Sequence, residues 1–218
     1  MVGAQEKADF DSIEPPWRLA LDLAWEGLGA GAVPVGAVVL DGSGNMVTNG
    51  RGRSFETSAP PGQLCGSRIA HAEINALAQL EGDGFYEDHE LLTTVEPCPL
   101  CMGAALMTGL GTVVYAFEDP YGGGRTMTID NVRSARTTMR VEQGPHRMVR
   151  MLSALMVFLH YRQLRPIPVV QEPLEATVPD VAAIAGGPLG AKIMKSAQEL
   201  MPLSDAVELF VSATAESG

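Results

Sequence analysis

The chain has 218 residues, of which 46% are hydrophobic and 19% charged. This length suits one domain with a substantial core and a shorter appended segment, and the composition excludes a disordered, highly charged chain. Its net charge of −11 lies mainly in residues 1–144, with 9 Lys and Arg against 19 Asp and Glu, which disfavours a large nucleic-acid partner without excluding one. No apolar run reaches the length of a membrane span, residues 1–16 lack the features of a signal peptide, and three cysteines predict no disulfide framework, so we expect a cytoplasmic protein with no membrane partner.

The first part of the chain predicts a helix, a β-hairpin and a long loop. Ser12 can cap a helix whose apolar residues recur at helical spacing as far as Leu28. The β-branched run at residues 33–40 predicts a buried strand, and residues 46–50 can return as its hairpin partner. Residues 54–68 contain several Pro and Gly and predict a surface loop, of a length often found in lids and binding loops.

The middle of the chain predicts two helices and two strands. Helical periodicity marks residues 69–80, and a strand is predicted at residues 90–95. A helix at residues 99–107 then leads to a strand at residues 112–117, so this part predicts a parallel β-α-β unit with a right-handed crossover. Residues 121–124 form a Gly-rich loop just after a strand, where α/β folds commonly place ligand contacts.

The last third predicts helices on either side of a linker. Residues 148–164 have the pattern of an amphipathic helix, and residues 166–190 are rich in Pro and Gly, which is typical of a linker or a surface strap. Helical periodicity returns between Ile193 and Phe210. We therefore expect a domain of residues 12–165, followed by a linker and a helical C-terminal extension over residues 166–218.

Three side chains of the types that bind zinc occur at predicted helix starts. Cys98 and Cys101 form a C-x-x-C motif where one helix begins, and His71 lies near the start of another. Two cysteines three apart at a helix start can both face one ion, and the positive end of the helix favours their thiolates. Two thiolates and one neutral imidazole balance the charge of Zn²⁺ and leave a fourth position for water, which is typical of a catalytic zinc site.

Glu73 lies two residues after His71 and supplies a carboxylate beside this expected site. In a continuous helix it would point about 200° away from His71, so we expect it to act at the helix entrance and not as a ligand. Zinc lowers the pKa of a bound water to about 7. A carboxylate beside that water can act first as base and then as acid, which suits hydrolytic release of ammonia from an amidine-like heterocycle.

Other uses of these residues remain open from the sequence. A C-x-x-C motif alone can be a redox dithiol or half of a structural zinc site. Cys65 could join the other two cysteines and the histidine in a Cys₃His structural site, although this arrangement leaves Glu73 without a purpose and places one ligand on a loop. The remaining histidines (His89, His146 and His160) have no partners at ligand spacing and are expected at the surface or in packing.

The combination of H-x-E with P-C-x-x-C resembles the zinc-dependent cytidine deaminase superfamily, and within it the branch of tRNA adenosine, guanine and cytosine deaminases. The resemblance covers residues 17–124 and is carried by residues 33–39, 71–77, 92–104 and 113–115. Either half of the motif alone would be a weak signal, whereas the combination is highly specific.

The resemblance implies an α/β fold, a three-layer α/β/α sandwich around a mixed five-stranded sheet, with one zinc ion per chain and a homodimer. It implies His71, Cys98 and Cys101 as zinc ligands and Glu73 as the proton shuttle. The branch commonly has an Asn after a G-x-G-x motif, whereas here that motif is followed by Ser54. The candidate substrate contacts are Ala72, Ser54, Asn49, Pro97 and Tyr121.

These features together predict hydrolytic deamination of a free nucleobase, a nucleoside or a related small amino-heterocycle. The acidic character of the catalytic segment favours the small substrate. One alternative keeps the enzyme and makes the wobble adenosine of tRNA the substrate. A second alternative, from a different class, is a zinc-stabilised binding or partner subunit without turnover, in which Cys65 would be a fourth zinc ligand.

Overall fold

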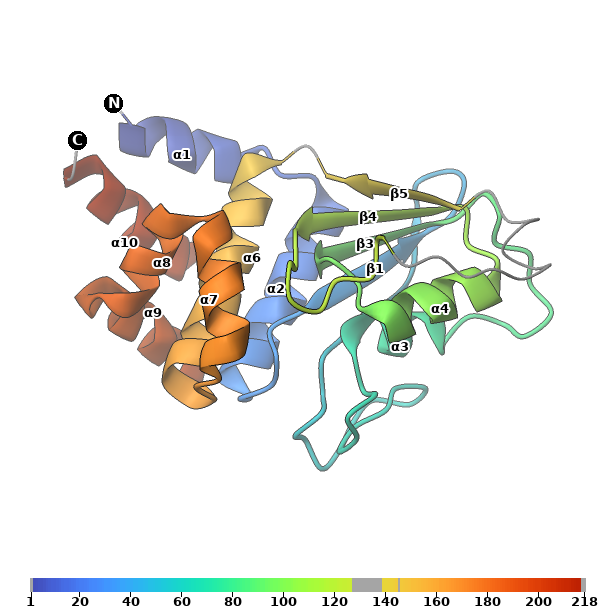
Figure 1. Ribbon diagram of the computed structural model, residues 1–218. Coiled ribbons are helices and arrows are strands. Elements are labelled where there is room, and N and C mark those ends of the chain that lie inside the picture. Colours follow the sequence, from blue (N-terminus) through green and yellow to red (C-terminus); the bar gives the residue numbers. More distant parts are fainter. Residues whose placement is uncertain (1, 127–138, 145, 217–218) are drawn as a thin grey trace.

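The computed structural model describes residues 2–126, 139–144 and 146–216, and these residues form a central sheet with helices on both faces (Figure 1). The helices are α1 (Val2–Asp11), α2 (Pro15–Gly29), α3 (Ala72–Leu77), α4 (Pro99–Thr108), α6 (Arg147–Leu159), the π-helix η1 (His160–Leu164), α7 (Pro168–Thr177), α8 (Pro179–Gly186), α9 (Pro188–Gln198) and α10 (Leu203–Glu216). The strands are β1 (Gly36–Leu40), β2 (Met46–Arg51), β3 (Glu90–Val95), β4 (Thr112–Phe117) and β5 (Arg140–Gln143).

The five strands form one mixed sheet in the order β2-β1-β3-β4-β5. β1 pairs antiparallel with both β2 and β3, whereas β3, β4 and β5 run parallel to one another. The parallel strands β3 and β4 are joined through α4, because parallel neighbours need a crossover connection. The predicted α/β fold with a mixed five-stranded sheet and a helical C-terminal region is confirmed.

Alternate residues of the central strands face two different helical layers. Val38 and Leu92 pair across β1 and β3 and belong to the larger core, which α2 and α6 cover. Val39 and Leu91, the next pair along, pack instead with Ala72 of α3 in a second core. Because successive side chains of a strand point to opposite faces, the apolar run of each strand supplies both cores and holds three layers together.

The helices α7 to α10 pack outside α2 and α6 and share the larger core with them (Figure 1). The prediction of a linker or strap at residues 166–190 is wrong, because α7 and α8 occupy most of this range. Of the five prolines in this range, three lie in the first turns of helices, at Pro168, Pro179 and Pro188, whereas Pro173 lies inside α7. Proline fits in a first turn, since its missing N–H has no intrahelical partner at that position.

Besides α7 and α8, the elements α1 and β5 were not predicted from the sequence. Ser12 does not cap α2; its hydroxyl donates to the carbonyl of Asp9 (2.8 Å) at the end of α1, and α2 follows Glu14 without a side-chain cap. β5 has no buried residue and therefore no apolar alternation that would reveal a strand. In the part of the chain that the structure describes, none of the helices is long and apolar enough to cross a membrane.

His160, at the start of η1, is fully buried, and neither ring nitrogen has a hydrogen-bond partner among the described residues. Burial, and then the positive charge of Arg165, lowers the pKa of His160 from 6.5 to about 4. Between these two values the unfolded chain binds a proton that the folded chain does not bind. We therefore predict that His160 lowers the free energy of unfolding by up to about 3 kcal/mol as the pH falls from about 6.5 to about 4.

Urea unfolding of the wild-type protein and of His160→Leu, each measured at several pH values, checks this prediction. All other titrating groups are common to both proteins, so the difference between the two pH profiles reports the histidine alone. The variant is expected to lose less stability than the wild type over this range. Parallel profiles would show that the imidazole does not titrate as its burial implies.

Candidate active site

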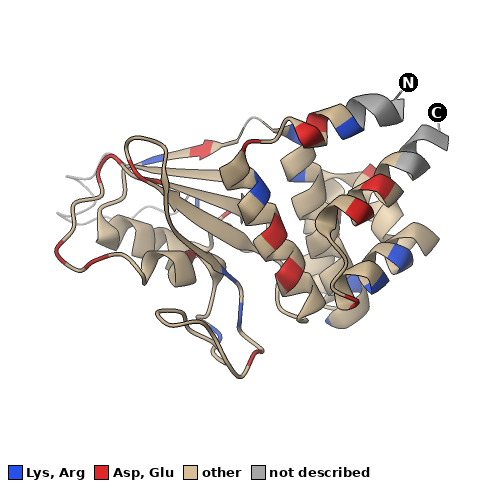
Figure 2. Ribbon diagram, turned by 180° about the vertical axis from the view of Figure 1, so that it is seen from behind, with Lys and Arg blue, Asp and Glu red and all other residues tan. Residues whose placement is uncertain are grey.

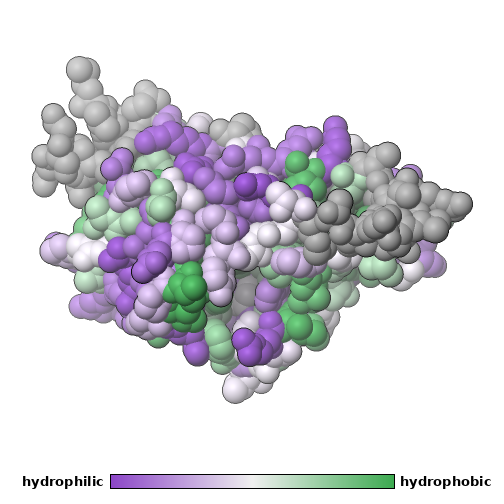
Figure 3. Space-filling model, in the orientation of Figure 1, coloured by the Kyte–Doolittle hydropathy of each residue, from purple (hydrophilic) through white to green (hydrophobic). Residues whose placement is uncertain are grey.

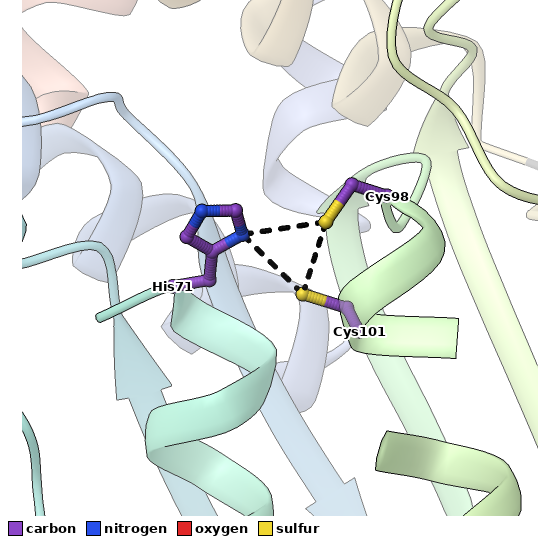
Figure 4. Close-up of side chains that lie close together, drawn as sticks. All are labelled: His71, Cys98 and Cys101. Atoms are coloured by element: carbon purple, nitrogen blue, oxygen red, sulfur yellow. Dashed lines mark hydrogen bonds between the residues drawn. The ribbon is translucent and has the colours of Figure 1, made fainter. Parts of the chain in front are cut away.

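His71, Cys98 and Cys101 converge on one point between two helix starts (Figure 4). The Nδ1 atom of His71 lies 3.5 Å from Sγ of Cys98 and 3.4 Å from Sγ of Cys101, and the two sulfur atoms are 3.6 Å apart. His71 is the residue that immediately precedes α3, and Cys98 immediately precedes α4. The two motifs of the sequence therefore meet because the two helices begin side by side at one edge of the sheet.

The spacing of these three atoms fits a tetrahedral zinc ion. Zinc lies about 2.3 Å from sulfur and about 2.0–2.1 Å from imidazole nitrogen, so a tetrahedron places these ligand atoms about 3.5–3.8 Å apart. The three observed separations of 3.4 to 3.6 Å agree with those edges. His71, Cys98 and Cys101 can therefore hold one zinc ion and leave a fourth position open.

The charges of the two thiols also favour a cation at this point. A hydrogen bond from Cys101, and to a smaller extent one from His71, lowers the pKa of Cys98 to about 4 against the effect of burial. The same bond, together with burial, raises the pKa of Cys101. Without a cation the pair thus holds one thiolate and one thiol, and a divalent metal ion would replace the shared proton and make both sulfurs thiolates.

Glu73 lies in the first turn of α3, beside the three-residue group and almost fully buried. Its Oε2 accepts a hydrogen bond from Sγ of Cys101 (3.3 Å), and its Oε1 accepts one from Oγ1 of Thr93 on β3 (3.3 Å). Burial raises the pKa of Glu73, because the charged carboxylate loses its water shell. The arrangement places a carboxyl that can exchange protons next to the point where the three ligand atoms meet.

The other cysteine and the surface histidines lie outside this group. Among the described residues, the group that could hold a metal ion does not include Cys65, which is half-buried in a loop, so the Cys₃His site is not formed. His89 lies 2.7 Å from Asp88, and His146 lies 2.6 Å from Glu14. These two histidines contact acidic side chains, consistent with the expected surface role.

Tight packing of α3 on β2 fixes the position of the site. A Cβ atom added at Gly50 would lie 2.6 Å from both the carbonyl oxygen of Ala72 and the amide nitrogen of Ala76. Only glycine lets the strand approach the helix so closely. Because α3 carries Glu73 and directly follows His71, this contact sets how far both side chains stand from the sheet.

Asn75, which is fully buried in α3, ties the loop at residues 54–68 to the site. Its side chain donates to the carbonyls of Arg51 (2.9 Å) and Leu64 (3.1 Å) and accepts from the N–H of Leu64 (2.7 Å). The substitution Asn75→Ala leaves these buried backbone groups unpaired, so we expect the free energy of unfolding to fall by about 3 kcal/mol.

Urea unfolding measures this loss, and limited proteolysis shows whether the loop becomes easier to cleave. The matched control is Asn45→Ala, because Asn45 is exposed and its side chain contacts only the Asp41 carboxylate among the described residues. We expect the control to change the unfolding free energy by less than about 1 kcal/mol. Equal losses in the two variants would mean that Asn75 does not anchor the loop.

His71 and Cys98, together with Glu73, line a cavity of about 190 Å³. Three of the candidate substrate contacts, Ala72, Ser54 and Tyr121, line this cavity, whereas Asn49 and Pro97 do not. A larger cleft of about 780 Å³ lies between α2 and the connection from α9 to α10, but none of the metal-site residues lines it. The smaller cavity is therefore the one that can bring a ligand to this chemistry.

Asn49 and Pro97 instead use their backbone to hold neighbouring segments. The carbonyl of Asn49 accepts hydrogen bonds from the side chains of Gln63 (3.1 Å) and Gln79 (2.6 Å). The carbonyl of Pro97 accepts one from the N–H of Gly124 (2.8 Å), which holds the loop after β4 against the start of α4. Both residues are close to the site in the chain, but proximity in sequence did not place them in the cavity.

Several residues that line the cavity were not predicted from the sequence. Asp119 lies two residues beyond β4, at the carboxyl end of a parallel strand, and this position was the available signal for it. The side of the cavity formed by α6, η1 and α7 had no comparable signal, because the sequence of these segments has only the pattern of an ordinary helix or a linker. These wall residues are Val157, Tyr161, Val170 and Leu174.

Comparison with known proteins connects the geometry to a family. Residues 12–117 match the family model described as "cytidine and deoxycytidylate deaminase zinc-binding region". A tRNA(Ile)-lysidine synthase of Deinococcus radiodurans is 37% identical over 127 residues, which are 56% of this chain and 20% of that protein. A tRNA-specific adenosine deaminase of Haemophilus influenzae is 34% identical over 124 residues, which are 55% of this chain and 65% of that protein.

The chain thus spans a fifth of the length of the first relative and 65% of the second. A solved structure of an NE0047 variant in complex with 8-azaguanine superimposes with a TM-score of 0.50 at 25% sequence identity, over 66% of this chain and 81% of that chain. Residues 12–117 contain all three side chains of the converging group and the neighbouring carboxyl of Glu73, whereas α6 to α10 lie outside the matched range.

Proposed function

The chain belongs to the cytidine deaminase superfamily through residues 12–117, and on this basis we propose that it is a zinc-dependent hydrolytic deaminase of a nucleobase, a nucleoside or a related small amino-heterocycle. The observation that carries the proposal is the convergence of His71, Cys98 and Cys101 beside the buried carboxyl of Glu73, at the base of a small cavity. The solved complex of a structural neighbour with 8-azaguanine supports a small heterocyclic ligand.

His71 would hold the zinc through Nδ1, and Cys98 and Cys101 through their sulfur atoms. Zinc in such a site supplies a Lewis acid and a water whose pKa falls to about 7. The starts of α3 and α4 meet here, and the positive ends of two helices favour negative charge at the same point. The chain therefore stabilises thiolates and a developing oxyanion in one place.

Glu73 would handle the protons of the reaction. Its carboxyl takes a proton from the attacking water and gives it to a ring nitrogen of the substrate. It then passes the second proton of the water to the amino group, which leaves as ammonia while a carbonyl forms on the ring. The raised pKa of Glu73 suits this double role, because a group that acts as both base and acid works best near its own pKa.

Ammonia release by the zinc-loaded protein tests the proposal. The panel consists of cytosine, cytidine, adenosine, guanine and guanosine, each with and without a chelator. We expect turnover of at least one member, and loss of that turnover when the metal is removed. Silence on every member would count against a small-molecule deaminase.

The tRNA-specific name of one relative makes wobble adenosine in tRNA the second candidate substrate. The net charge of this chain disfavours tRNA, because Asp and Glu outnumber Lys and Arg by 26 to 15, and Figure 2 shows acidic residues on the same face as the basic ones. Two of the arginines, Arg125 and Arg150, already pair with Glu96 and Glu118. Inosine in tRNA, with activity that falls steeply as salt rises, would favour this alternative.

We also propose that the protein forms a homodimer through α4. Leu100 and Met107 lie two turns apart on one face of this helix and are 44% and 63% exposed. Ile69, just before α3, is 50% exposed. A second copy would cover such apolar side chains. Analytical sedimentation of the wild type and of Met107→Glu tests this proposal. We expect the variant to shift towards the monomer, and a wild type that is already monomeric would contradict the proposal.

A further inference from the structure

The far side of the metal-site cavity is built from a part of the chain that lies outside the family match. Val157 of α6, Tyr161 of η1, and Val170 and Leu174 of α7 line the same cavity as the metal-site residues. We propose that these four residues, called here the helical wall, restrict the site to a free amino-heterocycle and exclude one that carries a ribose. This inference rests on the proposed deaminase function.

The helical wall is a fixed part of the fold. Val157, Val170 and Leu174 are 3%, 7% and 2% exposed and belong to the larger core shared with α2 and α6. Two hydrogen bonds of 2.6 Å from the guanidinium of Arg162 in η1 to the carboxylate of Glu175 also join η1 to α7. Because these side chains are packed from behind, the wall cannot move aside for a larger ligand without opening the core.

A second contact, called here the rim contact, lies next to Ser54, one of the residues that line the cavity. The guanidinium of Arg165, which follows η1, lies 3.4 Å from the ring centroid of Phe55, and the neighbouring Ser54 lines the cavity. The loop at residues 54–68 thus touches the C-terminal helices beside the site. In Figure 3 apolar surface lies on both sides of the hollow between α7 and the starts of α3 and α4.

The volume of the cavity fits a single heterocyclic base. Pockets for drug-sized ligands measure about 300–1,000 Å³, and this cavity measures about 190 Å³. A ribose roughly doubles the number of non-hydrogen atoms of a base. With the amino-bearing carbon at the metal site, a nucleoside has more atoms than this volume holds, so we expect its ribose to press against the helical wall.

The chemistry of the helical wall points the same way. Three of its four side chains are aliphatic, and Tyr161 offers its single hydroxyl. A ribose pressed against Val157, Val170 and Leu174 would lose water from its hydroxyls without gaining hydrogen bonds. Each unpaired hydroxyl is expected to lower the affinity by about 5–150-fold, which corresponds to roughly 1–3 kcal/mol. The flat apolar face of a base meets no such penalty.

The test compares each base with its own nucleoside, both in turnover and in binding. Turnover is measured as kcat/KM for cytosine, adenine and guanine and for cytidine, adenosine and guanosine with the zinc-loaded full chain. Binding is measured by calorimetric titration of the same compounds into Glu73→Ala protein, which would leave the ligands intact. We expect kcat/KM and binding affinity each to be at least about tenfold higher for the preferred base than for its nucleoside.

Two variants change the helical wall and the rim contact, and one serves as a control. Leu174→Ala removes side-chain volume from the wall, and we expect the nucleoside-to-base ratio to rise at least about fivefold. Arg165→Ala removes the rim contact from an exposed residue, which preserves the test if the first variant does not fold. The control is Leu203→Ala, because Leu203 is equally buried but lines the other cleft, and its ratio should equal that of the wild type.

The outcomes separate this inference from the proposed function. Turnover or binding of a nucleoside as good as that of its base overturns the helical wall as a filter and leaves the deaminase intact. So does a ratio that stays at the wild-type value in both Leu174→Ala and Arg165→Ala. If no compound is turned over, the deaminase proposal fails, and the calorimetric comparison still decides whether the cavity selects bases over nucleosides.

Discussion

Replacement of Glu73 by glutamine should lower kcat by about 10²–10⁴-fold, the range that proton transfer by a positioned side chain contributes. Glutamine keeps the shape of the side chain but can neither take the proton of water nor deliver it to the substrate. The measurement is ammonia release at saturating substrate, with zinc content determined on the same sample. Because Glu73 is not among the three convergent ligand atoms, the variant should keep about one zinc ion per chain.

The stability of this variant separates catalysis from folding. The carboxyl of Glu73 is desolvated, and burial raises its pKa, so a neutral amide in its place should leave the free energy of unfolding unchanged or increase it. The control is Glu90→Gln, a half-buried carboxylate of β3 that does not line the cavity, and it should retain activity. If the wild type shows no turnover and the Glu73 substitution changes its properties little, the protein would be a zinc-stabilised partner subunit and not an enzyme.

The converging group could be predicted from the sequence because its residues belong to two short motifs, H-x-E and P-C-x-x-C, with fixed spacings. Two cysteines three apart after a proline place both thiols at one helix start, and the histidine motif lies at the start of another. Residues that act through tertiary contacts had no such signature. Asn75 was expected only as part of a motif, yet its side chain holds Leu64 from both sides. The helical wall begins 56 residues beyond Cys101 in the sequence, at Val157, so no local pattern connects it to the cavity.

The elements of the fold also differ in whether a local sequence pattern reveals them. The strands β1, β3 and β4 are buried apolar runs and were predicted close to their observed bounds. β5 is an exposed edge strand with two charged residues among its four, so only its parallel pairing with β4 identifies it. In α7 and α8, the prolines at the first turns carried the same compositional signal as a linker. The difference lies in the burial of residues such as Leu174 and Val181, which becomes visible only in the folded structure.

Cys98→Ala should abolish stoichiometric zinc binding. The sulfur of Cys98 forms two of the three edges of the ligand triangle, and its pKa of about 4 makes it the readier thiolate of the pair. Its loss leaves one thiol and one imidazole, which are too few to hold zinc against a chelator. Zinc content by elemental analysis after dialysis should fall from about one ion per chain to a small fraction of that value. The matched control is Cys65→Ala, because Cys65 lies outside the group, and this variant should retain full zinc.

The same substitution should also uncouple thermal stability from the metal. Zinc held as proposed would bind the folded chain through residues at the starts of both α3 and α4, so at a free concentration of a hundred times Kd it would stabilise the fold by about 2.7 kcal/mol. For a chain of this size that corresponds to about 5–10 °C in Tm. A chelator should therefore lower the Tm of the wild type and of Cys65→Ala by this amount and leave Cys98→Ala unchanged. If Cys98→Ala keeps one zinc ion per chain and still loses stability on chelation, then the ion is held elsewhere. The assignment of His71, Cys98 and Cys101 as its ligands would then have to be abandoned.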